Sequence, residues 1–453
     1  MSNAVAAAVT ELAPSFAGHL IPPSDLRFNT ARMVHNGLID KHPALVAQCR
    51  GIADIADAVR LGRRLGLDIA VRGGGHNVAG RGTIDGGLVI DLSLMKGIHV
   101  DPKKRTARVE GGALWREFNR ETQVHGLATT GGVIGTTGVG GLTLGGGLGW
   151  LMSKHGMALD NLISVDLVLA DGKLVRAAED EHSDLFWAVR GGGGNFGVAA
   201  SFEFRLHPVG PVVTAGIVAH PVDRAKDVLR FFRTATESLP DDMMLIGGVL
   251  TAEDGVTKVA AIVGAHFGSP QDGEAAMRPI KQFGQPILDA IGPMAYSALA
   301  GMLDGGFPRG ARNYWKSHFL DQLTDGAIDA IVERFTQCPS PMSAILLEHF
   351  HGAATRVSPT ATAYALRSPG YNLVVLSQWK EPSDDARGLA WGRESYAAVQ
   401  PFVGQKRYLN YLGEDEGDQA LTDAYGPNLS RLRQLKAKYD SENVFHVNVN
   451  IKP

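Results

Sequence analysis

Apolar positions in the first half of the chain switch between helical and strand spacing. Ile52, Ile55 and Val59 share one helical face, which predicts a helix over 52–65. A second helix is predicted over 113–125. Short apolar runs bounded by turn residues predict strands at 68–72, 88–92, 98–110 (a pair turning at Asp101-Pro102), 165–170 and 174–178 (a hairpin around Asp171-Gly172) and 198–206. Because helices and strands do not alternate regularly, the pattern predicts a mixed α+β unit rather than repeated βαβ units.

After Pro208 the runs become longer. Strands are predicted at 212–220, 243–251, 257–267, 344–350 and 373–379, and helices at 223–238, 270–283 and 384–399. Asp254-Gly255 separates two of these strands and is a turn signal. The segment 208–404 is therefore predicted to form a second domain, an antiparallel sheet covered by helices on one side.

The strand at 68–72 leads into Arg72-Gly73-Gly74-Gly75-His76-Asn77. Consecutive glycines take positive φ readily and let the backbone approach a ligand closely. Successive backbone N–H groups in such a turn can form an anion nest, which suits a pyrophosphate. A histidine directly behind the nest would lie beside the anchored molecule, which indicates a nucleotide cofactor held against an imidazole. The alternative for these six residues alone is a glycine-rich turn with a surface histidine.

Two further glycine clusters favour a ligand. Residues 131–150 are half glycine, mixed with Val, Ile, Leu, Thr and Trp and free of charge, whereas a solvent-exposed linker would mix its glycines with Ser, Pro and charged residues. Residues 190–197, RGGGGNFG, contain the spacing GxGxxG. A Rossmann loop needs a strand before it and a helix after it, and here the order is reversed. The clusters therefore predict buried backbone packed against a large, flat ligand.

Four segments together resemble the flavin domain of the berberine bridge enzyme-like oxidoreductases, FAD proteins of the vanillyl-alcohol oxidase type. They are RGGGHN, GVGGLTLGGGLGW, LDNLISVDLVLADG and DLFWAVRGGGGNFGV, and the ending NVFHVNVN also matches the family. The resemblance implies a PCMH-type FAD-binding domain in residues 1–207, a substrate domain in 208–404, and a return to the FAD-binding domain in 405–453.

The resemblance also implies how FAD is held. In this family the histidine that matches His76 is bonded covalently to the methyl carbon of the flavin ring. Members with a second link use a cysteine in the motif G-x-C-P-x-x-G-V-G-G. Ile134 and Gly135 occupy the Cys-Pro positions here, so a single link is expected. The residues expected to contact FAD are Arg72, Gly73, Gly74, Gly75, His76, Asn77, Gly80, Thr136, Thr137, Gly138, Gly140, Gly141, Thr143, Gly146, Asp160, Asn161, Gly197, Val198, Asn448 and Asn450.

Oxidation of a substrate by a flavin removes a hydride and a proton, so the site needs a base. The segment 408–411, YLNY, resembles the family motif Y-x-N-Y, in which the second tyrosine often faces the substrate. Tyr411 is therefore the candidate base, and His351 is the second choice. His351 and Arg407 are also candidate helpers that would stabilise a Tyr411 phenolate.

Other polar residues are expected to line the substrate cavity. They are Asn372, Gln378, Tyr408 (with a mainly structural role) and Asn410. Some family members use a glutamate as base at the position that matches Asn372, so an acidic base is not expected at that position. Glu348, His349 and His351 could suggest a metal, but two histidines alone are a weak metal signature. The preferred alternatives are that one histidine lines a substrate cavity or that both are packing and surface residues.

The predicted function is an FAD-dependent oxidoreductase that oxidises a small-molecule alcohol, sugar, phenol or amine by hydride transfer to a covalent flavin. Reoxidation by O2, giving hydrogen peroxide, is typical of the family. A residue linked to oxygen access in the family, often valine in oxidases, is Thr137 here. The alternatives are a dehydrogenase with another electron acceptor and a non-catalytic FAD-binding protein.

Composition narrows the partners further. The chain of 453 residues has 44 basic and 47 acidic side chains and no block of like charge, so neither nucleic acid nor an acidic membrane surface is expected. Cys49 and Cys338 are its two cysteines, which suggests no disulfide framework, and no metal site is expected. The first thirty residues lack a signal-peptide pattern and no apolar run reaches the length of a membrane span, so a cytoplasmic protein is expected.

Overall fold

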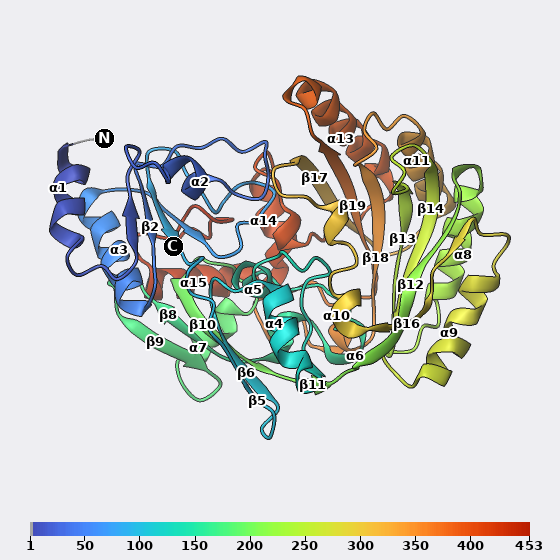
Figure 1. The fold of residues 1–453 in the computed structure, drawn as a ribbon, viewed down its shortest axis with the longest axis horizontal. Coiled ribbons are helices and arrows are strands. Elements are labelled where there is room, and N and C mark those ends of the chain that lie inside the picture. The colour runs from blue at the N-terminus through green and yellow to red at the C-terminus, as the bar shows by residue number, and fades with distance from the viewer. Residues whose placement is uncertain (1–2) are drawn as a thin grey trace.

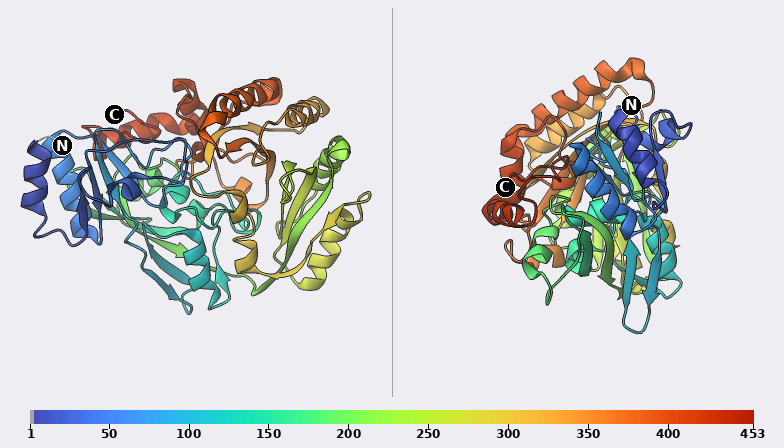
Figure 2. Two further views of the ribbon diagram at one scale, coloured as in Figure 1. Left: turned by 45° about the horizontal axis from the view of Figure 1, so that its top comes forward. Right: turned by 90° about the vertical axis from the view of Figure 1, so that its left-hand side faces the viewer.

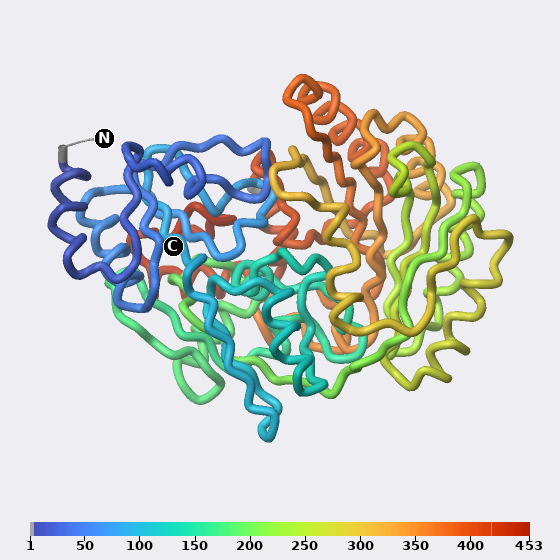
Figure 3. The backbone as a smooth tube through the Cα atoms, viewed as in Figure 1, coloured from blue at the N-terminus to red at the C-terminus, as the bar shows by residue number. Residues whose placement is uncertain are grey.

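The computed structural model describes residues 3–453. Two sheet-containing halves lie side by side, with the N-terminal half on the left of Figure 1 and a large sheet on the right. The C-terminal segment returns to the N-terminal half, as the red and blue ends of the tube show in Figure 3. The left view in Figure 2 also shows the two termini in this same half.

The first small sheet has the strand order β1-β2-β4-β3. The strands are β1 (His19–Ile21), β2 (Leu45–Gln48), β4 (Leu88–Asp91) and β3 (Ile69–Arg72). The β4 strand pairs in parallel with both β2 and β3. Helix α3 (Ile52–Leu65) connects β2 to β3 and buries Ile55 and Val59 against this sheet. It confirms the predicted helix, and α1 (Asn3–Leu12) packs outside it.

A second sheet is antiparallel, with the order β5-β6-β10-β8-β9. Its strands are β5 (Ile98–Asp101), β6 (Thr106–Glu110), β10 (Val198–Arg205), β8 (Leu162–Val168) and β9 (Leu174–Ala178). The predicted hairpin around Asp171-Gly172 is present, and Gly172 takes a φ of 80° in its turn. Helices α4 (Trp115–Gln123) and α7 (Ser183–Val189) pack into the same core, so the mixed α+β prediction is confirmed.

The right half is an eight-stranded antiparallel sheet with the order β15-β12-β14-β13-β18-β19-β17, and β16 also pairs with β12. The strands are β12 (Val212–Pro221), β13 (Met243–Thr251), β14 (Lys258–His266), β15 (Leu288–Asp289), β16 (Gly292–Ala295), β17 (Arg312–Leu320), β18 (Ala344–Phe350) and β19 (Gly370–Trp379). Four helices pack against it: α8 (Ala225–Thr236), α9 (Pro270–Gln282), α11 (Asp325–Thr336) and α13 (Asp385–Val399). Figure 1 shows them on the outer side of the sheet. The predicted antiparallel sheet covered by helices is confirmed.

The two faces of this sheet have different neighbours because side chains alternate along a strand. On β19, Leu373 and Val375 lie in the core formed with the four outer helices. Val374 and Leu376 belong to a separate cluster on the opposite face, together with Trp315 of β17. We call this opposite face, which looks towards the N-terminal half, the inner face.

Short elements complete the fold. They are α2 (Phe28–Arg32), the paired strands β7 (Leu127–Ala128) and β11 (His207–Pro208), α5 (Val139–Leu144), α6 (Met152–His155), α10 (Tyr296–Leu299), α12 (Ala353–Arg356), α14 (Asp418–Tyr425) and α15 (Leu429–Tyr439). Within residues 3–453, the helices lack the length and apolar character needed to cross a bilayer.

Candidate active site

A large cavity lies between the glycine-rich loops and the inner face of the eight-stranded sheet. Residues drawn from the segments 71–78, 132–145 and 193–197 form one wall, and side chains of β13, β17, β18 and β19 form the opposite wall. The 3₁₀ turn Leu409–Tyr411 and the C-terminal residues Asn448 and Val449 close its rim. The cavity therefore joins segments that are more than three hundred residues apart in sequence.

Two glycine-rich loops cross each other in the first wall. A Cβ atom on Gly74 would lie 2.5 Å from the nitrogen of Gly138, and a Cβ on Gly138 would lie 2.4 Å from the nitrogen of Gly74. Gly75 has a φ of 68°, in the left-handed region that favours glycine. The loops therefore present backbone rather than side chains to the cavity, as a nest for phosphate groups requires.

Arg72 supports this loop from behind. Its guanidinium forms an ion pair with Asp91 at 2.8 Å, and both side chains are almost completely buried. Asp91 also accepts hydrogen bonds from Gln48 and Ser93. This pairing satisfies the buried charge of Arg72, so the residue fixes where the glycine loop begins.

His76 follows that loop and borders the cavity. Its Nε2 lies 3.2 Å from Oγ1 of Thr136, and its ring stacks on His35 with 3.8 Å between the ring centroids. Removal from water, and secondarily the neighbouring His35, lowers the pKa of His76 to about 3. The imidazole is therefore neutral near pH 7 and keeps a nitrogen lone pair that can form a bond to carbon.

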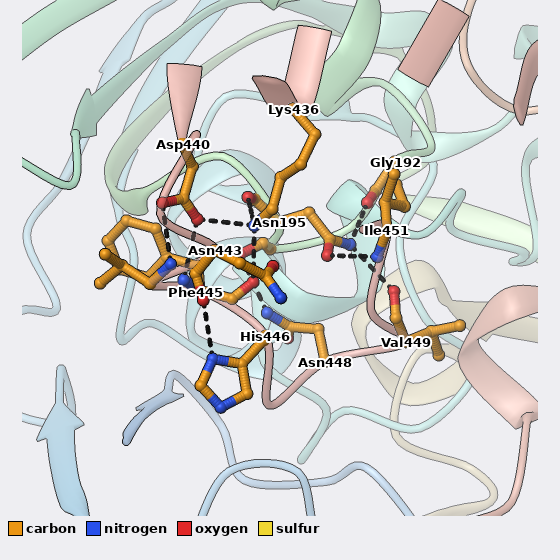
Figure 4. A network of polar contacts seen from close by, with 12 residues as sticks. Gly192, Asn195, Lys436, Asp440, Asn443, Phe445, His446, Asn448, Val449 and Ile451 are labelled. Carbon is orange, nitrogen blue, oxygen red and sulfur yellow. Dashed lines mark hydrogen bonds and ion pairs between the residues drawn. The ribbon is translucent and has the colours of Figure 1, made fainter. Parts of the chain in front are cut away.

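A buried polar network holds the C-terminal segment against the loop 191–197 (Figure 4). The Lys436 ammonium donates to Asp440 at 2.6 Å and to the carbonyls of Asn195 and Phe445. The Asn195 side chain donates to the carbonyls of Gly192 and Val449 and accepts from the Ile451 N–H. Because Lys436 uses all three of its donors, the network fixes the tail at the cavity rim.

The opposite wall contains a buried carboxyl group. Glu348 is 6% exposed, and its Oε1 accepts a hydrogen bond from the Tyr411 hydroxyl at 3.2 Å. Its Oε2 accepts from Nδ2 of Asn372 at 2.6 Å. Asn372 and Glu348 are cross-strand partners on β19 and β18, so the sheet register sets this contact. Because position 372 is an asparagine, no acidic base was expected there. The structure nevertheless places the carboxyl group of Glu348 next to Asn372.

Burial sets the protonation properties of this pair. It raises the pKa of Glu348 to about 7, although the bonds from Asn372 and Tyr411 act in the opposite direction. Burial, followed by the charge of Glu348, raises the pKa of Tyr411 well above its usual value. Glu348 is therefore the group of the two that can gain or lose a proton near neutrality.

Tyr408 and Asn410 support the glycine-rich wall. The Tyr408 hydroxyl accepts hydrogen bonds from the N–H groups of Gly147 and Leu148 and from Nδ2 of Asn410. Asn410 also donates to the carbonyl of Leu142 at 3.0 Å. Burial raises the pKa of Tyr408 to about 12, so this tyrosine is a neutral hydrogen-bonding partner.

Most of the predicted site residues border the cavity. They are Arg72, Gly73, Gly74, Gly75, His76, Asn77, Thr137, Gly138, Gly140, Gly141, Gly197, Tyr408, Asn410, Tyr411 and Asn448. The other predicted residues lie outside its lining: Gly80, Thr136, Thr143, Gly146, Asp160, Asn161, Val198, His351, Asn372, Gln378 and Asn450.

Several of the outlying residues have clear structural partners. Asp160 accepts two hydrogen bonds from Arg367, and Asn161 donates to the carbonyls of His155 and Met157. Thr143 bonds to the carbonyl of Val139 within its own helix. These residues stabilise the loops behind the cavity instead of bordering it.

The structure does not bring His351 or Arg407 to Tyr411. His349 has the opposite strand parity to Glu348, and it stacks on His351 and on Tyr371 of the helix-facing core. Arg407 forms ion pairs with Glu416 and Asp423 instead. Glu348 bonds to Tyr411 and Asn372, whereas the two histidines stack on each other.

Side chains that were not predicted complete the inner-face wall. They include Glu348, Trp315, Leu346, Val374 and Leu376. The alternation of strand residues was a usable signal, because Glu348 differs in parity from His349 and His351. Its approach to Tyr411 joins two segments sixty-three residues apart in sequence, which local patterns do not reveal.

Comparisons with known proteins agree with this geometry. Residues 43–178 match the model of an FAD binding domain, and residues 407–452 match the model described as berberine and berberine like. An FAD-linked oxidoreductase of Dictyostelium discoideum is 31% identical over 413 residues, 91% of this chain and 89% of that protein.

Solved structures show the same fold. The 6-hydroxy-D-nicotine oxidase of Arthrobacter nicotinovorans has a TM-score of 0.89 at 29% identity, covering 97% of this chain and 98% of that chain. The glucooligosaccharide oxidase of Acremonium strictum, described with a 6-S-cysteinyl, 8α-N1-histidyl FAD, has a TM-score of 0.87 at 25% identity, covering 100% and 99%.

The glycine loops fit the phosphate-bearing part of FAD because side chains are absent where the two loops cross, and the tail network completes the rim of the same cavity. FAD is therefore the cofactor of this protein, and its family's enzymes are oxidoreductases. The chain belongs to the berberine bridge enzyme-like family of FAD-dependent oxidoreductases.

Proposed function

We propose that this protein oxidises a small-molecule alcohol, sugar, phenol or amine by hydride transfer to FAD, and that Glu348 receives the substrate's proton through Tyr411. The observation that carries the proposal is the 3.2 Å contact between Tyr411 and buried Glu348 in the cavity that His76 also borders. The cavity lies between the predicted FAD-binding segments (1–207 and 405–453) and the predicted substrate domain (208–404), a division that the separate sheets support.

When bound, FAD accepts a hydride from the substrate. Side chains of the protein accept the substrate's proton. A substrate hydroxyl or amine that donates to the Tyr411 oxygen can pass its proton there while the Tyr411 proton moves to Glu348 Oε1. Asn372 holds the carboxylate in place through Oε2. Glu348 must be ionised for this transfer, and a pKa near 7 allows it to accept and release a proton near neutral pH.

We further propose a single covalent bond between His76 and FAD. The neutral imidazole supports this assignment, and Thr136 engages Nε2 and so leaves Nδ1 as the bonding nitrogen. Ile134 stands where a second, cysteinyl link would need a thiol. The relative with a histidyl FAD provides a precedent within the same fold.

The His76 bond is tested by mass spectrometry of digested protein. One FAD should add to the peptide that contains His76, and denatured protein should stay yellow. The His76→Ala variant should lose the bond, whereas the exposed control His125→Ala should keep it. Release of all flavin from the parent on acid precipitation would contradict a covalent link.

The overall reaction is tested by an anaerobic screen for flavin bleaching with alcohols, sugars, phenols and amines, followed by admission of air. Bleaching followed by rapid recovery and peroxide formation would support an oxidase, which is the reaction that the names of the nicotine and glucooligosaccharide relatives indicate. Bleaching that persists in air for many minutes would support a dehydrogenase. If no compound bleached the flavin, a non-catalytic FAD-binding protein would be the better interpretation.

A further inference from the structure

The inner face of the sheet presents an apolar wall to the cavity. Its members are Ile246 of β13, Trp315 of β17, Leu346 of β18, and Val374 and Leu376 of β19. They come from four strands, and each occupies the strand parity that faces the cavity. Phe307 packs against Trp315 with 5.7 Å between ring centroids and extends this wall. We use the name apolar wall for the five strand residues.

Polar side chains near this wall are already engaged within the protein. The Trp315 indole N–H donates to Oδ1 of Asn313, and Asn313 donates to the carbonyl of Ala311. Gln378 donates to the carbonyl of Gly306. Ser317 Oγ and Asn372 Oδ1 have no partner among the described residues, but neither residue borders the cavity. The apolar wall thus offers few hydrogen bonds to a ligand.

Positive charge is also missing from this side of the cavity. Among residues 3–453, the Lys and Arg side chains that border the cavity are Arg72 and Arg81, both in the glycine-loop half. Arg72 is paired with Asp91, and Arg81 donates to the carbonyls of Asn448 and Gly413. A carboxylate on the substrate would therefore lie against Glu348 and apolar groups without a cationic partner.

We propose that the substrate is a largely apolar molecule that carries one hydroxyl or amino group. The apolar wall holds its hydrocarbon or aromatic body, and the Glu348–Tyr411 pair binds the single polar group. Sugars are disfavoured because their remaining hydroxyls would exchange water for apolar contacts. Carboxylates are disfavoured because a substrate carboxylate would lie near Glu348 without a cationic partner. This inference rests on the proposed function only for the position of the reacting group.

The test is ligand binding to the FAD-loaded enzyme, followed as a change in the flavin absorbance spectrum. The probes are 1-propanol to 1-hexanol, the corresponding 1-alkylamines, glucose, cellobiose and hexanoate. Affinity should rise about three- to fourfold for each added methylene in the alcohol or amine series, the gain expected from burying a CH2 group. Glucose, cellobiose and hexanoate should leave the spectrum unchanged.

A near-isosteric variant sharpens the test. Val374→Thr adds a hydroxyl to the apolar wall at almost unchanged volume, so it should reduce the gain per methylene to less than about twofold. The control Leu288→Asn changes a half-exposed residue on β15 and should keep the parent's gain. If Val374→Thr does not fold, the change in affinity along the alcohol and amine series in the parent protein tests the apolar site by itself.

The outcomes separate this inference from the proposed function, since the shift of the oxidised flavin spectrum on binding is distinct from the bleaching that marks turnover. If affinity rose steeply with each methylene but no compound bleached the flavin, the apolar site would be supported and the proposed reaction contradicted. Flavin bleaching by sugars combined with a flat series would support the reaction and overturn the apolar substrate. A spectrum that no alcohol or amine perturbs would also overturn it.

Discussion

The two walls of the cavity are built by different means. The glycine-rich wall uses backbone from loops that cross at Gly74 and Gly138, where even one added carbon would collide with a neighbouring main chain. The inner-face wall uses side chains at alternate positions of strands that are far apart in sequence. A wall built from backbone appears in the sequence as clusters of consecutive glycines. The residues of a wall built from side chains are scattered along the sequence.

This difference also predicts how each wall responds to change. The glycine-rich wall has little room, so small additions should affect FAD binding or folding. The inner-face wall can accept substitutions that change the reaction while FAD stays bound. The following predictions would sharpen or break that comparison.

The largest effect is expected from Tyr411→Phe, which removes the hydroxyl between the substrate and Glu348. Anaerobic flavin reduction should slow by roughly a hundredfold or more, the usual range for losing general acid–base assistance. Flavin content should match the parent, because the side chain of Tyr411 contacts Trp315 and Glu348 of the inner-face wall. Stopped-flow absorbance measures the rate, and a rate within about threefold of the parent's would contradict a proton-transfer role.

Lys436→Met should destabilise the glycine-rich side by breaking a buried ion pair. Asp440 would remain buried without its countercharge, which typically costs about 3–5 kcal/mol. Denaturant unfolding and the ratio of flavin to protein absorbance both report this loss. The double variant Lys436→Met/Asp440→Asn removes the stranded charge and should recover part of the stability. A single variant as stable as the parent would show that the tail network is not needed.

Gly74→Ala should lower FAD occupancy by forcing the two crossing loops apart. Overpacking of this kind costs about 1–3 kcal/mol. The matched control is Gly292→Ala on β16, where an added Cβ meets nothing within 4 Å. Purified Gly74→Ala with full flavin content and unchanged stability would show that the close crossing does not restrict this wall.

A smaller effect is expected from Thr137→Val in the glycine-rich wall. This change removes a hydroxyl from the cavity at nearly constant volume. It should speed reoxidation of the reduced flavin by air and leave anaerobic reduction within about threefold of the parent. Air-mixing of pre-reduced enzyme measures the first rate. If the two rates fell together, Thr137 would act on the substrate and not on oxygen.

Local patterns predicted the elements whose neighbours are near in sequence. The helix 52–65 and the hairpin at Asp171-Gly172 are examples, and each agrees closely with the structure. Neither β17 nor α11 was predicted. On β17, Lys316 is buried because Asp415 and Glu416, about a hundred residues later, neutralise it. Such a partner cannot be found from the strand's own alternation.

The candidate site divides in the same way. The motif containing His76 indicated its position in the cavity directly, because its function depends on contiguous glycines. Glu348 could be assigned only after β18 and β19 were paired in register opposite Asn372, and after Tyr411 returned from the C-terminal segment. His351 was chosen from resemblance, and in the structure it stacks on His349, whereas Tyr411 bonds to Glu348.

The central claim is that Glu348 receives the substrate's proton. It is tested most directly by the pH dependence of anaerobic flavin reduction in the parent and in Glu348→Gln, with flavin content checked in both. Burial raises the Glu348 pKa to about 7, so the parent's rate should rise with pH through that value as the carboxylate ionises. Glu348→Gln should be slower by roughly a hundredfold and lose this rise. A variant that keeps the parent's rate and pH profile would contradict the claim.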